Sequence, residues 1–379
     1  MAKQIMVCEC NGMKKCLKSL KKILFSLQSE MVTYWGYPSE DYEVMTEDGY
    51  ILGVYRTPYG KNHTNNSAQR PVVFLQHGLL TSASSWISNL PSNSLAFTGC
   101  DVWLGNSRGN AWSSRHSFLS VNSDQFWAFS FDEMATYDLP ATIDFIGRKT
   151  GQKEMYYIGH SQGTTVGVIS TLPRLAQRIK IFFALAPVIT IQHTKKFIHN
   201  TLFNRFIGTK LCSIQHLDSI CRSFLFMLCG FDFINLNMVS RMIWMRRSHY
   251  IFFMDFLLKT AFCFNSANQL SNKPLSILPF LGEKKQKTKL KPNHIIQRLQ
   301  PFPTSNWVFS IDKHVPTAAW NGGQDLVADP EDAKSSLPQI LPLIYHKMIL
   351  CYSRLDFIWG IDAPWAIYYE IINMIKKAL

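Results

Sequence analysis

The chain has 379 residues, of which 47% are hydrophobic and 13% aromatic, so it can bury a large core and is not a disordered protein. The 20 glycines and 17 prolines exclude a collagen-like fibre, and a mean hydropathy of -0.03 argues against a multi-span membrane protein. Lys and Arg outnumber Asp and Glu by 39 to 26, and this net charge of +13 raises the question of an anionic partner.

The N-terminal segment, residues 1–31, is basic and lacks the apolar core of roughly 7–15 residues that defines a standard signal peptide. Leucines recur at helical spacing over residues 17–27, and five lysines lie among residues 14–22. This pattern indicates either a membrane-surface helix with acylated cysteines, or an ordinary surface helix or leader. The segment therefore does not indicate in which cellular compartment the protein is located.

From about residue 42 to residue 190, short apolar runs alternate with helix-like segments. A capping box formed by Ser130 and Glu133 predicts the start of a helix, and Pro140 predicts that the helix restarts there. Such alternation is typical of a mainly parallel sheet with helices on both faces. The predicted strands are residues 42–46, 50–56, 72–76, 101–104, 155–159 and 179–185, the first two forming a hairpin.

Residues 190–310 break this rhythm, because helix-like apolar segments and a lysine-rich run at residues 283–291 replace it. Strand patterns return at residues 315–320 and 343–350, and a helical pattern over residues 364–377 follows. We therefore expect an α/β core in two parts, residues 32–189 and 313–379, separated by a helical cap insertion over residues 190–312. No metal-ligand spacing is present, and nothing indicates a cofactor.

The sequence Gly159-His160-Ser161-Gln162-Gly163 lies where a predicted strand meets a predicted helix. In such a nucleophile elbow the glycines allow a strained turn, and the serine stands exposed above the sheet. The positive end of the helix dipole also favours negative charge beside the serine. We expect Ser161 to be a catalytic nucleophile; the alternative is a serine in an ordinary tight turn.

A serine nucleophile needs two backbone N–H donors for the oxyanion of its tetrahedral intermediate. One donor is expected from Gln162, the residue after the nucleophile, and the other from the loop after an earlier strand. That loop reads His77-Gly78-Leu79-Leu80, so Leu79 is the candidate second donor. His77 is interpreted as a structural residue that shapes the loop.

The acid of a catalytic triad is expected after a later strand, and Asp325 ends a glycine-rich loop in that position. The order Ser161 then Asp325 is the order found in α/β-hydrolases. Asp329 lies four residues further on, before Pro330, and is interpreted as a helix cap.

Further motifs span about residues 32–379 in order, and on them the chain resembles the acid lipase family, which includes gastric and lysosomal acid lipases. The motifs are Tyr34-Trp35-Gly36-Tyr37-Pro38, Thr46-Glu47-Asp48-Gly49-Tyr50, His77-Gly78-Leu79-Leu80, Asp101-Val102-Trp103-Leu104-Gly105-Asn106-Ser107-Arg108-Gly109-Asn110, Ser130-Phe131-Asp132-Glu133-Met134, Gly159 to Thr165, and Trp320 to Pro330.

This resemblance implies an α/β-hydrolase fold, a helical cap over a lipid pocket, and hydrolysis of acylglycerols or steryl esters. It carries the nucleophile onto Ser161, the acid onto Asp325, and the oxyanion donors onto Leu79 and Gln162. It also implies a disulfide in the cap. The two cysteines of that disulfide would be Cys212 and Cys221.

The family places its catalytic histidine in a His-Leu-Asp-Phe-Ile-Trp pattern after the last strand, but this chain reads Arg354-Leu355-Asp356-Phe357-Ile358-Trp359. Arginine stays protonated in proteins and cannot act as a general base. We expect Arg354 to form an ion pair with Asp325 instead. Loss of the base in comparable triads lowers the rate by a factor on the order of 10⁴–10⁶.

Two other histidines are candidate replacement bases. His346 lies eight residues before Arg354 within the last predicted strand, a separation of roughly 26 Å along an extended chain. His314 lies eleven residues before Asp325 and is equally misplaced. Neither is expected to reach Ser161.

The sequence therefore predicts a lipase-like serine ester hydrolase of lipid metabolism whose activity is impaired by Arg354; the alternative is a lipid-binding pseudo-lipase without catalysis. The expected partner is a lipid ester, and a membrane or lipid-droplet surface is a further candidate. Nucleic acid is not expected, because no recognition motif accompanies the charge. Ten lysines of the surplus lie within residues 14–22 and 284–291, where the chain departs from the family pattern.

Overall fold

The middle strands of the sheet are buried on both faces, as their uninterrupted apolar sequences require. The sequence Val-Val-Phe-Leu-Gln of strand β3 (Val72–Gln76) is buried at every position, and so are all residues of the strands on either side of it in the sheet. By contrast, β1 (Glu40–Met45) lies at the edge of the sheet, and its exposed residues alternate with buried or partly buried ones. Burial on both faces is typical of parallel strands that are covered by helices.

The computed structural model describes residues 28–61, 70–79, 81–169, 173–190, 235 and 315–379. Within these residues, nine strands form one sheet in the order β1-β2-β4-β3-β6-β7-β8-β9, with β5 beside β2. The pairings of β1, β4 and β5 with β2 are antiparallel, and those from β4 through β9 are parallel. The remaining strands are β2 (Tyr50–Thr57), β4 (Asp101–Gly105), β5 (Arg115–His116), β6 (Met155–His160), β7 (Ile179–Leu185), β8 (Thr317–Gly322) and β9 (Leu343–Ile349).

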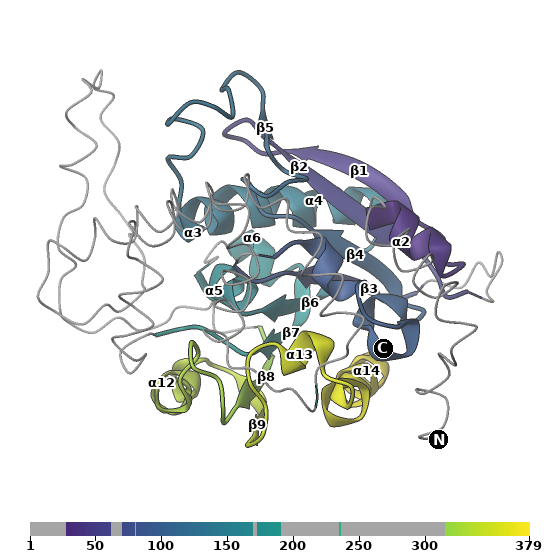
Figure 1. The fold of residues 1–379 in the computed structure, drawn as a ribbon, viewed down its shortest axis with the longest axis vertical. Coiled ribbons are helices and arrows are strands. Elements are labelled where there is room, and N and C mark those ends of the chain that lie inside the picture. The colour runs from purple at the N-terminus through teal and green to yellow at the C-terminus, as the bar shows by residue number, and fades with distance from the viewer. Residues whose placement is uncertain (1–27, 62–69, 80, 170–172, 191–234, 236–314) are drawn as a thin grey trace, which may run out of the picture.

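Helices cover both faces of this sheet (Figure 1). One buried cluster joins the sheet to α2 (Gln28–Tyr34), α13 (Asp356–Trp359) and α14 (Tyr369–Ala378). The other joins it to α4 (Leu139–Thr150), α5 (Gln162–Ile169), α6 (Pro173–Ala176) and α12 (Pro330–Ser336). The chain is thus a three-layer α/β-hydrolase fold with a mainly parallel sheet, as predicted.

Short helical elements lie between the larger helices and strands. They are α3 (Phe131–Glu133), the π-helical η5 (Met134–Asp138) and η10 (Pro364–Tyr368), and the 3-10 turns η2 (Ala83–Trp86), η3 (Pro91–Asn93), η4 (Leu95–Phe97) and η9 (Leu337–Gln339).

The α-helix α4 begins at Leu139 with Pro140 in its first turn, as the sequence predicts, but it continues from the preceding helical turns. Ser130 and Glu133 form the predicted capping box, but α3, η5 and α4 follow one another without a break. Proline lacks the N–H that an α-helix interior needs, and the wider π turn just before Pro140 accommodates this loss. The helix ends at Gly151, whose φ of 68° is the left-handed conformation of a helix C-cap.

Parallel strands bring their carboxyl ends to the same edge of the sheet, and the loops that follow β3, β6, β8 and β9 leave from that edge. Gln76 of β3 lies beside Gly159 of β6, and Leu185 of β7 pairs with both His160 and Trp320. In open α/β sheets, ligands bind outside the carboxyl ends of the strands. We therefore expect a functional site among the residues that follow these four strands.

Candidate active site

Ser161 occupies a strained turn between β6 and α5. Its φ of 57° lies in the left-handed region that residues with a side chain rarely adopt. The turn is held by hydrogen bonds from Ser161 N–H to Leu185 O at 3.0 Å and from Thr164 N–H to Ser161 O at 2.9 Å. A Cβ atom at Gly163 would lie 2.5 Å from the carbonyl oxygen of Gln76, so only glycine fits there. The local sequence thus produces the predicted elbow geometry.

The loop after β3 lies directly against Ser161. A Cβ atom at Gly78 would be 2.7 Å from Cβ and 3.0 Å from Oγ of Ser161. Leu79 follows Gly78 in this loop, and Gln162 begins α5 on the other side of Ser161. The backbone N–H groups of Leu79 and Gln162 donate to no other described residue, which leaves them for an incoming oxygen.

Asp325 lies in the loop after β8 and is buried, with 1% of its surface exposed. Its Oδ1 accepts hydrogen bonds from Val327 N–H and Ala328 N–H, both at 2.9 Å. Burial raises the pKa of Asp325, while Arg354 and these two amides act in the opposite direction. Asp329 caps α12 by accepting from Glu331 N–H at 2.9 Å, as predicted.

Arg354 lies between the other two residues of the predicted triad. Its Nη1 donates to both carboxylate oxygens of Asp325 at 3.1 Å, which is the ion pair expected from the sequence. Its Nη2 donates to Ser161 Oγ at 2.5 Å. The structure therefore brings Ser161, Asp325 and Arg354 together, and the guanidinium lies between the predicted nucleophile and the predicted acid.

Two anchors fix the loop that carries Arg354. Its carbonyl oxygen accepts from Nε2–H of His160 at 3.1 Å. The buried Asp356 carboxylate accepts from N–H and Oγ–H of Ser353, at 2.7 and 2.8 Å, and from Nδ2 of Asn235 at 3.2 Å. His160 and Asn235 were not among the predicted site residues. The position of His160 next to Ser161 was the only sequence signal for the first, and none existed for the second.

The described histidines near the site are held neutral by burial. Burial lowers the pKa of His77 to about 4 and that of His160 to about 3, where the charge of Arg354 contributes in the same direction. His77 is structural, as predicted: its Nδ1–H donates to Gly78 O at 2.7 Å, and its Nε2 accepts from Ser107 N–H at 3.1 Å. His346 lies on β9, where its Nε2 hydrogen-bonds Asn321 Oδ1 at 2.7 Å, and burial lowers its pKa. His314 lies outside the described residues.

A buried ion-pair network supports the loop after β4. Arg108, which is 1% exposed, contacts Asp138 at 2.7 Å and Asp48 at 2.6 Å, and its guanidinium carbon lies 4.0 Å from the ring centroid of Tyr50. The neighbouring Ser107 holds His77, so this network links the β4 loop to the loop that carries Leu79. Arg108, Asp48 and Tyr50 belong to the sequence motifs above, whereas Asp138 does not, and the pairing of these residues was not predicted.

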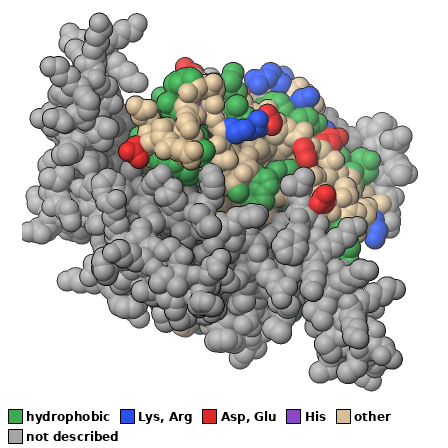
Figure 2. Space-filling view, turned by 45° about the horizontal axis from the view of Figure 1, so that its top comes forward, with side chains coloured by type: hydrophobic (Ala, Val, Ile, Leu, Met, Phe, Trp, Pro, Cys, Tyr) green, Lys and Arg blue, Asp and Glu red, His purple; other side chains and the backbone are tan. Residues whose placement is uncertain are grey.

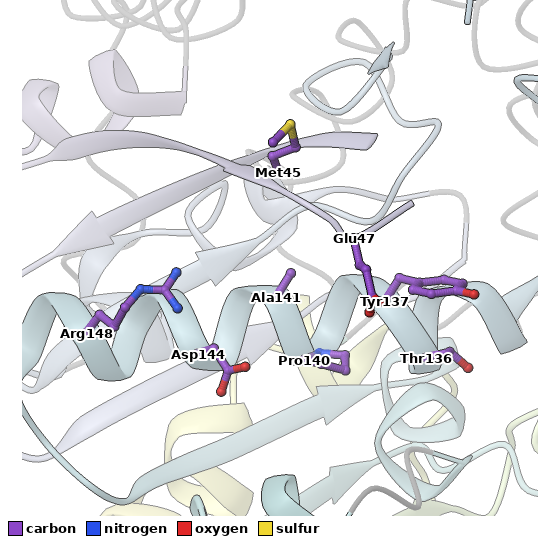
Figure 3. Close-up of a pocket in the computed structure, with 8 residues that line it drawn as sticks. All are labelled: Met45, Glu47, Thr136, Tyr137, Pro140, Ala141, Asp144 and Arg148. Atoms are coloured by element: carbon purple, nitrogen blue, oxygen red, sulfur yellow. The ribbon is translucent and has the colours of Figure 1, made fainter. Parts of the chain in front are cut away.

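A hollow with a volume of about 190 Å³ lies away from Ser161, between the β1–β2 hairpin and the η5–α4 helix. Figure 3 shows Glu47 reaching from the hairpin toward the helix and Asp144 pointing away from the hairpin. None of the predicted site residues lines this hollow. The lining residues are Met45, Glu47, Thr136, Tyr137, Pro140, Ala141, Asp144 and Arg148.

On the face shown in Figure 2, Lys and Arg side chains of the described residues are interspersed with Asp and Glu rather than gathered into one patch. Among the described helices, none is long and apolar enough to cross a bilayer. The two lysine-rich runs, the candidate membrane-surface helix, and Cys212 and Cys221 all lie outside the described residues, as does nearly all of the predicted cap.

The chain matches two family models and several curated proteins. Residues 28–90 match a partial alpha/beta-hydrolase lipase region, and residues 71–361 match the alpha/beta hydrolase fold. Gastric triacylglycerol lipase from Mus musculus is 48% identical, covering 92% of this chain and 91% of that protein. Lipase member K from Homo sapiens is 47% identical, covering 93% and 91%. Lipase member J from Homo sapiens is 44% identical, covering 93% and 99%.

Solved structures agree on the fold. A thermophilic esterase from Thermogutta terrifontis superposes with a TM-score of 0.52 at 12% identity, covering 89% of this chain and 99% of that one. An epoxide hydrolase from Vigna radiata superposes with a TM-score of 0.54 at 15% identity, covering 89% and 98%. At these identities the likeness shows a common fold and nothing finer.

Proposed function

This chain belongs to the α/β-hydrolase family of lipases that contains gastric triacylglycerol lipase, and on that premise we propose that it is a serine ester hydrolase for lipid esters whose activity Arg354 severely impairs. The substrate class rests on the relatives, which are lipases by name. The roles of Ser161 as nucleophile, Asp325 as acid, and Leu79 and Gln162 as oxyanion donors rest on the geometry above.

The observation that carries the proposal is the direction of the hydrogen bond between Arg354 and Ser161. A serine hydroxyl attacks an ester only when a neighbouring base accepts its proton. Nη2 of Arg354 lies within hydrogen-bond distance of Ser161 Oγ, but guanidinium is a donor and has no lone pair to offer. Asp325 is a poor substitute acceptor, because Arg354 lies between it and Ser161 and two backbone amides occupy its Oδ1.

What remains is the electrostatic part of the catalyst. The oxyanion donors and the strained elbow are present, and such groups alone retain a rate enhancement of roughly 10³–10⁴ over water in triads that lack a member. A slow hydrolase is therefore expected. The competing function is a pseudo-lipase that binds lipid without turnover, and the same arrangement of donors favours it. The two functions differ in that a pseudo-lipase would show no Ser161-dependent hydrolysis.

The test is an esterase assay with purified full-length chain, using a soluble medium-chain ester. We expect Arg354→His to raise kcat/KM by about 10³ or more, because histidine at this position accepts the serine proton and Asp325 orients its ring. A Ser161→Ala change added to Arg354→His is the matched control and should remove the gain. Equal turnover by the unaltered chain and Arg354→His would show that Arg354 is no obstacle.

A further inference from the structure

We propose that the Ser161–Arg354 site binds the carboxylate of a free fatty acid in preference to the neutral ester of the same acid. The proposal deepens the proposed function, because it takes this site to be the acyl-binding site of the lipase fold. It concerns which ligand is retained and involves no covalent step.

The hydrogen of the Ser161 hydroxyl lacks an acceptor among the described residues. Ser161 Oγ accepts from Nη2 of Arg354, so its own O–H must point elsewhere. No described residue accepts that hydrogen, although Ser161 is only 4% exposed. A buried hydroxyl donor without an acceptor is costly, and an anionic ligand oxygen at this position would satisfy it.

Apart from the Asp325 carboxylate, the predicted site residues next to Ser161 are hydrogen-bond donors. The N–H groups of Leu79 and Gln162 make no hydrogen bond within the described part of the chain, and Gln162 N–H lies at the positive end of α5. A hydrolase site combines such donors with one acceptor, the base. Here Arg354 replaces that acceptor, so the guanidinium and the two backbone N–H groups beside Ser161 are all donors.

The negative charge of Asp325 opposes an incoming anion, but neighbouring groups offset it. Asp325 contacts Nη1 of Arg354, whereas Nη2 faces Ser161, so the guanidinium lies between the two oxygen-bearing groups. Asp325 also accepts from Val327 N–H and Ala328 N–H, which offset part of its charge. The ligand therefore meets the hydroxyl, the backbone donors and the cation before it meets the carboxylate.

These donors discriminate between the two forms of an acyl group. Hydrogen bonds to an ionised acceptor are about twice as strong as those between neutral groups. A carboxylate has two charged oxygens to accept from Ser161 and the backbone donors, and an ester has one neutral carbonyl oxygen. The acyl chain is common to both, so the difference in affinity reports the head group alone.

The experiment measures the Kd of radiolabelled oleate and of radiolabelled methyl oleate with the purified full-length chain at pH 8, where the free acid is ionised. We expect oleate to bind at least about tenfold more tightly than methyl oleate, as a charge-assisted contact requires. Arg354→Gln should weaken oleate binding by about tenfold and change methyl oleate binding by less than about twofold. Arg115→Gln, which alters an exposed cation paired with Glu43, is the matched control and should change neither.

Equal affinity for the two ligands in the unaltered chain, or an equal loss of both in Arg354→Gln, would overturn the proposal. If Arg354→Gln does not fold, the oleate preference of the unaltered chain still decides, and Ser161→Ala should reduce that preference. Failure here is distinct from failure of the proposed function. The proposed function is tested by hydrolysis in Arg354→His, whereas the preference for a carboxylate is tested by binding, which needs no turnover.

Discussion

Nη2 of Arg354 lies 2.5 Å from Oγ of Ser161, so a permanent hydrogen-bond donor stands where a triad needs an acceptor. The same guanidinium neutralises Asp325, and the three side chains form one buried group. The arrangement pairs the two charges of Arg354 and Asp325 and is poorly suited to proton transfer.

The Asp325–Arg354 pair is expected to be important for stability. Removing one partner of a buried ion pair leaves an uncompensated charge and typically costs about 3–5 kcal/mol. We therefore expect Asp325→Asn to lower the free energy of unfolding by about that amount in denaturant titrations. The control is Asp329→Asn, because asparagine caps a helix nearly as well as aspartate. Equal stability of the two variants would show that the pair contributes little.

The elbow is expected to reject any side chain at Gly163. An added Cβ atom would lie 2.5 Å from the backbone oxygen of Gln76, and a backbone atom cannot move aside cheaply. Gly163→Ala should therefore lower the melting temperature markedly. Gly147→Ala in α4 is the matched control, since its Cβ would meet the flexible end of Arg178 at 3.2 Å and would lie at an ordinary contact distance of 3.6 Å from the backbone oxygen of Gln152. It should be neutral or raise stability by up to about 1 kcal/mol, as alanine does in helices. A similar melting temperature for both variants would contradict the account of the elbow.

His77 is expected to make the protein less stable in acid. Its folded pKa of about 4 lies below the ordinary value of 6.5, so between these values the unfolded chain binds a proton that the folded chain does not. Stability present above pH 6.5 is then lost as the pH falls toward 4, by about 1.4 kcal/mol per pH unit.

His77→Asn retains a donor for Gly78 O but does not titrate, so the free energy of unfolding should fall less steeply between pH 6.5 and 4 in this variant. His160 acts in the same direction in both chains, and because the charge of His77 is only the last of the causes that lower the pKa of His160, the difference between the chains mainly reports His77. Denaturant titrations at several pH values provide the measurement. Parallel curves for the two chains would contradict the assignment of a neutral, buried His77.

Much of the fold could be predicted from the sequence because its signals are local. The run at residues 72–76 is apolar throughout, since β3 is buried on both faces, and the glycines around Ser161 mark a turn that only glycine permits. The ion pair of Arg354 with Asp325 followed from charge and from their expected positions. The π turn η5 was missed, because Pro140 indicates a helix start and the sequence does not show how a preceding turn widens.

Other features could not be predicted because they depend on distant parts of the chain meeting. The hydrogen bond from His160 to Arg354 O spans 194 residues, and the contact of Arg108 with Asp48 spans 60. Nothing in the local sequence of either partner indicates the other. The substitution at position 354 was visible in the sequence, but that Nη2 would also reach Ser161 required the loop geometry that Asp356 and His160 fix.

The most direct test of the central claim, that Arg354 leaves Ser161 unactivated, is the rate at which a fluorophosphonate probe labels Ser161 in the full-length chain. Such labelling requires a serine whose proton can be removed. The account predicts that the unaltered chain is labelled at least about 10³-fold more slowly than Arg354→His, and that Ser161→Ala abolishes labelling in both backgrounds. Labelling of the unaltered chain at the rate of Arg354→His would contradict it.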